Sequence, residues 1–176
     1  MIEKPLSFPL DGDGFFRREC PLCFREFKVR LREDELGELA QRFLDHFMVE
    51  QGLQQDDTEN GNVEERFCPY CAQSSPCDDW WTQEQLAYIQ VAAKNMMAHI
   101  YNEHFARPMM RENRRHQAFI RIDVKEMQQE DEWISPERSD MRLVNLPCCD
   151  RQQKVADDWG KKVNCFFCGF THPGNA

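Results

Sequence analysis

The sequence of 176 residues has no long apolar run. A membrane-spanning helix needs about 18 or more consecutive residues that are mostly apolar, and no segment approaches this length. The first ten residues carry two charged residues and two prolines, unlike the apolar core of a secretion signal. We therefore expect no membrane association and a cytoplasmic location.

The chain also has no excess of positively charged residues. The chain has 22 Lys and Arg residues against 31 Asp and Glu residues, and its net charge of −9 repels free nucleic acid on average. An apolar share of 41% and a mean hydropathy of −0.74 indicate a thin hydrophobic core. Small units with little core usually need an additional staple, such as a bound metal.

Signatures of catalysis are also missing. The chain has no glycine-rich phosphate loop, and no nucleophile with a partner base can be named. A zinc deaminase needs Glu two residues after a His, but Tyr101 follows His99 and Ala106 follows His104 at this spacing. We therefore do not expect an enzyme.

What the sequence does have is nine cysteines, eight of them in pairs. Zinc binds four thiolates tetrahedrally, and a two-residue gap lets one tight turn aim two sulfurs at one ion. In a reducing compartment such pairs indicate metal ligands rather than disulfides. The sequence therefore predicts two structural zinc ions. Cys77 has no partner at this spacing and is expected to be spare. The pairs are Cys20 with Cys23, Cys68 with Cys71, Cys148 with Cys149, and Cys165 with Cys168.

Pairing of nearest neighbours along the chain assigns the first two pairs to site one and the last two to site two. A cross-pairing, in which the first and last pairs share one metal, stays open. At site two, adjacent side chains of an extended strand point apart, so both cysteines bind only if the backbone bends between them. Otherwise one of them binds, and His172, four residues beyond Cys168, completes a set of three cysteines and one histidine.

Local patterns predict the elements around these pairs. Alternation over residues 15–31 predicts two short strands flanking the first pair, and apolar spacing over 33–50 predicts a helix. The polar, acidic segment 51–66 is expected to be a loop. No internal repeat is visible beyond the cysteine pairs.

The clearest helix begins at Thr82, because Thr82 and Gln85 have the spacing of a capping box. Pro108 is expected to end or kink it. Alternating residues then predict further β structure. The expected elements are strands over 118–127 and 141–146, and a hairpin with arms at 154–155 and 161–163.

Several segments resemble known zinc ribbons, the rubredoxin-like four-cysteine units. Phe-Cys-Pro-Tyr-Cys (67–71) with Asp-Asp-Trp-Trp (78–81), and Leu-Pro-Cys-Cys-Asp (146–150) with Cys-Phe-Phe-Cys-Gly (165–169), resemble uncharacterised bacterial double-zinc-ribbon proteins. Glycine often follows the second cysteine of a ribbon, so a different turn shape is expected at Phe24 and Ala72. The resemblance implies fold and zinc but no activity.

We therefore expect an α+β protein with two small zinc-ribbon β units joined by a prominent α-helix, and a helix-loop insertion in the first ribbon. The expected domains are 1–81, the N-terminal ribbon with its inserted helix and acidic loop, 82–117, the connecting helix, and 118–176, the C-terminal ribbon. The expected function is that of a non-enzymatic interaction module, an adaptor or accessory subunit of a bacterial assembly that binds a protein partner.

The alternative function is nucleic-acid binding through one basic stretch. Residues 106–128 hold six Lys and Arg residues against three acidic ones. The candidate phosphate contacts are Arg111, Arg114, Arg115 and Arg121. The same arginines also fit a solvated helix end, because cations stabilise a helix C-terminus.

Overall fold

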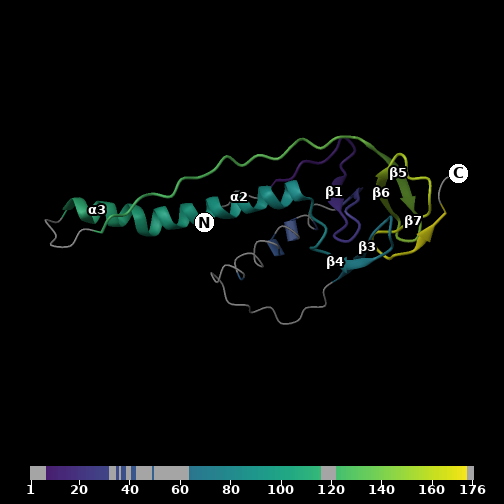
Figure 1. Cartoon of the computed structure of the whole chain (residues 1–176), viewed down its shortest axis with the longest axis horizontal. Helices are drawn as coiled ribbons and strands as arrows, with labels where there is room; N and C mark the ends of the chain where they lie inside the picture. The colour runs from purple at the N-terminus through teal and green to yellow at the C-terminus, as the bar shows by residue number, and fades with distance from the viewer. Residues whose placement is uncertain are drawn as a thin grey trace. The chain divides into compact units, whose positions relative to one another are not determined.

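The computed structural model describes residues 7–31, 35, 37, 38, 41, 42, 49, 64–115 and 122–173 (Figure 1). They belong to two compact units. Ala87–Trp133 forms one, here called the helical unit, and Ser7–Leu86 with Ile134–Ala176 forms the other, here called the cysteine unit. The domain boundaries expected from the sequence run differently from these units and stay a prediction. All eight paired cysteines lie in the cysteine unit, and the chain combines α and β structure as expected.

A four-stranded antiparallel sheet forms the centre of the cysteine unit, in the order β1-β2-β6-β5. The two strands predicted around the first cysteine pair are confirmed, and the strand predicted over 141–146 is confirmed to the residue. The predicted hairpin with arms at 154–155 and 161–163 is wrong, because its first arm pairs instead with β2 and β5. The strands are β1 (Phe16–Glu19), β2 (Glu26–Val29), β5 (Met141–Leu146) and β6 (Arg151–Ala156).

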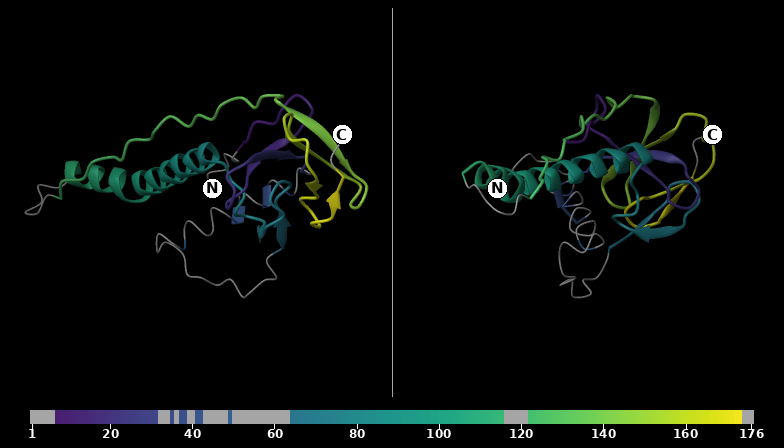
Figure 2. Two further views of the ribbon diagram at one scale, coloured as in Figure 1. Left: turned by 45° about the vertical axis from the view of Figure 1, so that its right-hand side comes forward. Right: turned by 60° about the vertical axis from the view of Figure 1, so that its left-hand side comes forward.

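Two smaller antiparallel hairpins complete the β structure (Figure 2). β3 (Glu65–Phe67) pairs with β4 (Ser74–Pro76), and β7 (Val163–Asn164) pairs with β8 (Thr171–His172). β3 begins inside the predicted loop 51–66, so the loop prediction is wrong at Glu65 and Arg66. Residues 51–63, and most of the helix predicted over 33–50, lie outside the described residues.

The cysteine unit contains an internal duplication. Arg17 pairs with Lys28 and Leu143 with Lys154, and both pairings have the same offsets from the second cysteine of the turn, Cys23 or Cys149: six residues before it and five after it. The small hairpins match in the same way, and their main chains bond reciprocally: Phe67 N–H donates to Phe166 O at 2.9 Å, and Asn164 N–H to Pro69 O at 3.0 Å.

The pairing at the centre of the sheet shows how the two halves are related. The equivalent residues Lys28 and Lys154 pair with each other across β2 and β6, as an approximate two-fold axis requires. The repeat cannot be recognised in the sequence, because the two halves share the same strand register but differ in most residue types.

The hydrophobic core of this unit is built around its thiols. Phe27, Trp80 and Phe166 pack with ring centroids 5.3–5.8 Å apart, and Cys20 and Cys68 are fully buried beside them. Edge-to-face aromatic pairs of this kind add stabilisation beyond the area they bury. Disorder at the thiols would therefore disrupt the packing of the hydrophobic core.

The opposite face of the sheet buries charged groups. The Lys28 side chain is fully buried, with Nζ 2.9 Å from Asp140 and 3.1 Å from Glu137. Lys154 Nζ donates to Asp11 Oδ2 at 2.8 Å. Residue alternation on β2 and β6 sends Phe27 and Val29 to the core and both lysines to this face.

The helical unit contains most of α2 (Gln83–Tyr101), the π-helical turn η1 (Asn102–Ala106) and α3 (Arg107–Arg115). The predicted capping box is confirmed: Thr82 N–H donates to Gln85 Oε1 at 2.9 Å, and Gln85 N–H to Thr82 Oγ1 at 3.2 Å. Pro108 lies in the first turn of α3, directly after the π turn, so helical structure continues through it.

The strand predicted over 118–127 is not confirmed where the structure describes it. Residues 118–121 lie outside the described part, and residues 122–127 form no β ladder. The main chain here bonds instead to asparagine side chains of the neighbouring helices.

Candidate metal centres

Each cysteine pair sits in a tight turn at the tip of a hairpin, and three of these turns share one shape. The residue after the second cysteine has a positive φ: 56° at Phe24, 62° at Ala72 and 72° at Gly169. Its N–H donates to the carbonyl of the first cysteine at 2.9–3.1 Å in all three. The expectation of a different shape at Phe24 and Ala72 is therefore wrong. Non-glycine residues adopt this backbone conformation at a cost of about 1–2 kcal/mol.

The fourth turn has its positive φ at the equivalent position, but it is closed by a different hydrogen bond and one of its cysteines is at a different position. Asp150 has the positive φ, 50°, and Cys149 N–H donates to Leu146 O at 3.1 Å. Leu146 therefore takes the place of the first cysteine, and Cys148 takes the position that Leu22 has in the first turn. The bend needed for two adjacent cysteines to face one ion is thus supplied by the turn itself.

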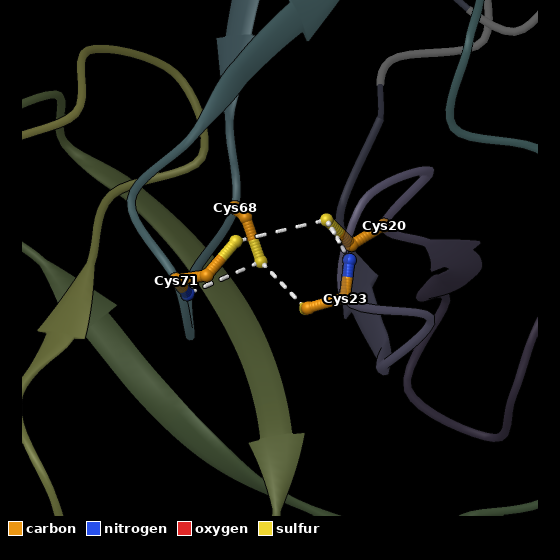
Figure 3. Close-up of side chains that lie close together, drawn as sticks. All are labelled: Cys20, Cys23, Cys68 and Cys71. Atoms are coloured by element: carbon orange, nitrogen blue, oxygen red, sulfur yellow. Dashed lines mark hydrogen bonds between the residues drawn. The ribbon is translucent and has the colours of Figure 1, made fainter.

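Site one brings together Cys20, Cys23, Cys68 and Cys71 (Figure 3). The Sγ atoms of Cys20 and Cys71 are 3.8 Å apart, and those of Cys23 and Cys68 are 3.7 Å apart. Two backbone amides approach Sγ of Cys20 at 3.4 Å, and two approach Sγ of Cys68 at 3.4–3.5 Å. Amide hydrogens in this position stabilise negative charge on a ligating sulfur.

Site two brings together Cys148, Cys149, Cys165 and Cys168. The sulfur of Cys149 lies 3.8 Å from that of Cys165, and that of Cys148 lies 3.6 Å from that of Cys168. His172 Nε2 lies 3.2 Å from Cys148 Sγ, so all five candidate donors for this site are adjacent. Cys148 and Cys168 are exposed, whereas site one has no exposed cysteine.

Both sets fit a tetrahedral ion. Zinc holds sulfur at about 2.3 Å, which requires sulfurs about 3.8 Å apart. In each set the four sulfurs lie within 4.8 Å of one another, and all nine cysteines are free of disulfides. The structure therefore brings the first two cysteine pairs together and the last two pairs together, and it does not bring the first pair to the last. Cys77 is buried outside both sets, as expected for the spare thiol.

Without a cation most of these sulfurs favour the protonated form, although backbone and thiol hydrogen bonds outweigh burial and lower the pKa of Cys71 and of Cys168. Burial raises the pKa of Cys68, and it raises the pKa of Cys165 to about 11. Burial, with hydrogen bonding to Cys168 and Cys165, raises the pKa of Cys149 to about 11. Four thiolates in contact therefore need a bound cation, and metal binding at neutral pH would release protons.

Two side chains that sequence reasoning missed hold the metal-site turns on the sheet. Tyr70 Oη donates to Glu26 O at 2.7 Å and accepts from Ala156 N–H at 2.9 Å, so it bridges β2 and β6. Gln153 is fully buried; its Nε2 donates to Asn164 O at 2.9 Å, and its Oε1 accepts from Phe166 N–H at 3.1 Å. Tyr70 lies within the Cys-Pro-Tyr-Cys motif and Gln153 in no motif, but neither role could be predicted, since each depends on contacts distant along the chain.

The candidate phosphate-binding arginines are only partly described. Arg111 and Arg114 are exposed on α3, while the side chain of Arg115 and all of Arg121 lie outside the described residues. Arg107, in the same basic stretch, pairs with Glu103 and Glu126.

No family model matches the chain, and no curated protein or solved structure matches it. The resemblance to double-zinc-ribbon proteins therefore stays a prediction, while the two four-cysteine sets capable of holding metal stand on the geometry. Within the described ranges no helix is long and apolar enough to cross a bilayer.

The equivalent turn positions Gly169 and Ala72 give opposite predictions. A Cβ at Gly169 would lie 2.9 Å from the Phe67 ring, on a backbone with φ of 72°. Gly169→Ala should therefore destabilise the unit by about 2 kcal/mol or more, whereas Ala72→Gly should relieve strain and stabilise it by about 1 kcal/mol. Denaturant unfolding at fixed zinc concentration measures both, and a loss of stability in Ala72→Gly would contradict the argument.

His172 predicts an unusual tolerance at Cys148. In Cys148→Ala, His172 should become the fourth ligand, and the site should keep its metal, because three cysteines and one histidine form a common zinc set. Cobalt substitution reports the change as weaker sulfur-to-metal absorption. Cys148→Ala combined with His172→Ala should lose the ion from site two, as should Cys165→Ala. Equal metal retention in the single and double variants would contradict a role for His172.

Proposed function

We propose that this chain is a non-enzymatic interaction module stabilised by two structural zinc ions. The observation that supports it most directly is the closure of both sites. In each, four cysteines can supply all four ligands of a tetrahedral ion, whereas a catalytic zinc needs one open position for water or substrate. The proposed metal ligands are the eight paired cysteines, with His172 beside site two.

On this proposal each half of the cysteine unit is a zinc ribbon: β1 to β4 with site one, and β5 to β8 with site two. The helix that joins the ribbons along the chain starts at the Thr82 capping box, and the segment between β2 and β3 is the helix-loop insertion. Free thiolates of this kind persist in a reducing compartment such as the cytoplasm, where we place the protein.

The proposed metal sites, each closed by four cysteines, stabilise a unit that has only a small hydrophobic core. This arrangement favours a rigid platform that binds a protein partner. The role proposed is that of an adaptor or accessory subunit of a larger assembly. Affinity capture from the native host, followed by gel filtration with each purified candidate, tests it. A partner should co-elute with the wild type and with Cys77→Ser, but not with Cys20→Ser. Elution of the chain alone beside every candidate, or measurable turnover by the isolated chain, would contradict the proposal.

A second candidate function is nucleic-acid binding through α3. It is favoured by Arg111 and Arg114, which are exposed and form no ion pair among the described residues. A gel shift that weakens steeply with salt, and weakens further in Arg111→Gln with Arg114→Gln, would support it. The absence of any shift at low salt would remove it.

A further inference from the structure

The two edge strands of the four-stranded sheet, β1 and β5, are equivalent in the internal duplication. The β1 edge is covered: Glu19 N–H donates to Trp80 O at 3.0 Å, and Gln85 Nε2 donates to Arg17 O at 2.9 Å. The segment that carries the Thr82 capping box therefore closes this edge of the sheet with hydrogen bonds.

The β5 edge has no such cover. The equivalents of Arg17 and Glu19 are Leu143 and Asn145, because both pairs have the same offsets from the cysteines of their turns. The main-chain groups of Leu143 and Asn145 have no hydrogen-bond partner outside the sheet in the described part of the chain. Among the described helices and strands, only β6 makes extensive contacts with β5. The sheet therefore ends in a strand whose outer side is open.

The hydrogen bonds of β6 show which groups of β5 face outward. Ala156 N–H donates to Tyr70 Oη at 2.9 Å, and this hydroxyl bridges to β2, so the main chain of Ala156 faces β2 rather than β5. Met141 is opposite Ala156 in the register, and its main-chain groups are therefore turned away from β6. Because this direction alternates along an antiparallel ladder, Met141, Leu143 and Asn145 all turn their N–H and C=O groups outward.

The sequence of β5 does nothing to discourage pairing at this edge. Natural edge strands usually carry Lys, Pro or a bulge that prevents the addition of another strand. β5 has no Lys or Pro, and it pairs with β6 without a bulge over its whole length. Its central side chain, Leu143, is 46% exposed, and Arg142 is its one charged residue. The edge is therefore open to strand addition.

β5 is also complementary to itself. An antiparallel two-fold axis at Leu143 places Leu143 opposite its own copy and Met141 opposite Asn145 of the second copy. All outward-facing residues then meet outward-facing residues, and each such pair exchanges two main-chain hydrogen bonds. Arg142 lies opposite Val144 of the second copy, so no like charges meet across the strands. The two exposed Leu143 side chains become direct cross-strand neighbours, and such pairs stabilise a sheet.

We propose that β5 pairs with β5 of a second copy of this chain, antiparallel and about a two-fold axis at Leu143. The two sheets then form one continuous sheet, and the contact closes on itself because both copies use the same strand. The inference concerns assembly of the chain with itself, so it stands or falls independently of the proposed protein partner.

Sedimentation equilibrium of the whole zinc-loaded chain tests the axis by exchange of charge. The wild type should form dimers as its concentration is raised, and Leu143→Ile, which keeps an apolar side chain, should do the same. Leu143→Lys alone and Leu143→Glu alone should each dimerise about tenfold or more weakly, because identical charges then face each other. An equimolar mixture of these two variants should regain dimerisation, because the lysine of one copy faces the glutamate of the other.

Zinc content and circular dichroism check that each variant is folded. A wild type that stays monomeric up to its solubility limit would overturn the proposal. Dimerisation of either charged variant as strong as that of the wild type, or a mixture that stays monomeric, would overturn it too.

Hydrogen exchange locates the contact on the strand. The outward Asn145 N–H should be protected in the wild-type dimer and exchange rapidly in monomeric Leu143→Lys, whereas the Val144 N–H, which faces β6, should be protected in both. Rapid exchange of Asn145 in a wild-type dimer would place the interface elsewhere and overturn the inference. Protection of Asn145 only on binding of a captured protein, with the chain itself monomeric, would assign the edge to that protein and overturn it as well.

Discussion

Stripping the metal from this protein is expected to unfold the cysteine unit. Structural zinc contributes about 10–16 kcal/mol of apparent binding free energy per site, whereas the net stability of an ordinary domain is about 5–15 kcal/mol. Cys20 and Cys68 lie inside the core beside Trp80, so release of the ion would remove the bond that joins the four sulfurs at the centre of the packing.

Chelator titration monitored by Trp80 fluorescence measures the effect, because this indole is fully buried beside site one. The emission should shift to the red as metal leaves, and elemental analysis before titration should give two zinc ions per chain. Cys77→Ser is the matched control, since Cys77 is buried but belongs to neither set. It should melt close to the wild type, whereas Cys20→Ser should not fold. A metal-free chain that keeps a cooperative melt would contradict the prediction.

The turns that carry the cysteine pairs could be predicted from the sequence because their determinants are local. A two-residue gap between cysteines requires a tight turn, and a tight turn with alternating flanks requires a hairpin, which gave β1, β2 and β5 correctly. The capping box at Thr82 and Gln85 is equally local. In each case the interacting groups are a few residues apart, so their spacing along the chain determines their geometry.

The errors arose where the partner is distant or unusual. Lys154 and Val155 do lie on a strand, but the strand pairs with β2 rather than with residues 161–163, and alternation cannot identify a partner. Residues 122–127 alternate as a strand does, yet asparagine side chains take the place of the neighbouring strand. Phe24 and Ala72 show that hydrogen bonding in the turn can impose a positive φ on residues other than glycine.

The buried charged groups between the two halves of the cysteine unit could not be predicted from the sequence either. Lys28 and Lys154 pair across the centre of the sheet, and the Asp11 carboxylate, which is fully buried, lies between their ammonium groups. Asp11 Oδ2 is 2.8 Å from Lys154 Nζ and 3.4 Å from Lys28 Nζ, and Oδ1 accepts from Phe15 N–H at 3.0 Å. This one carboxylate therefore joins the N-terminal segment to both halves of the duplication.

Replacement of Asp11 by asparagine should consequently destabilise the unit by about 2 kcal/mol, because it removes the one fully buried carboxylate that contacts both ammonium groups, while Asp13 still pairs with Lys154 and Glu137 and Asp140 still pair with Lys28. Asp13→Asn is the control. Asp13 also contacts Lys154, at 2.6 Å, but its side chain is 64% exposed, so its loss should cost about 1 kcal/mol or less. Equal effects of the two substitutions in denaturant unfolding would contradict this account.

The pH dependence supplies an independent check on Asp11. Burial alone would raise the pKa of Asp11, but hydrogen bonds from Lys154 and from two backbone amides outweigh it and hold the pKa below the ordinary 3.8. Its contribution is therefore fully present above the unfolded value and is lost as the pH falls through the lower folded value. The stability difference between the wild type and Asp11→Asn should be constant near neutral pH and shrink below about pH 4. Acid also releases metal from thiolates, which should itself unfold the unit, so the two proteins are compared only over the pH range in which elemental analysis shows that both keep their metal. A difference that grows on acidification would show that the Asp11 charge does not stabilise the pair of lysines.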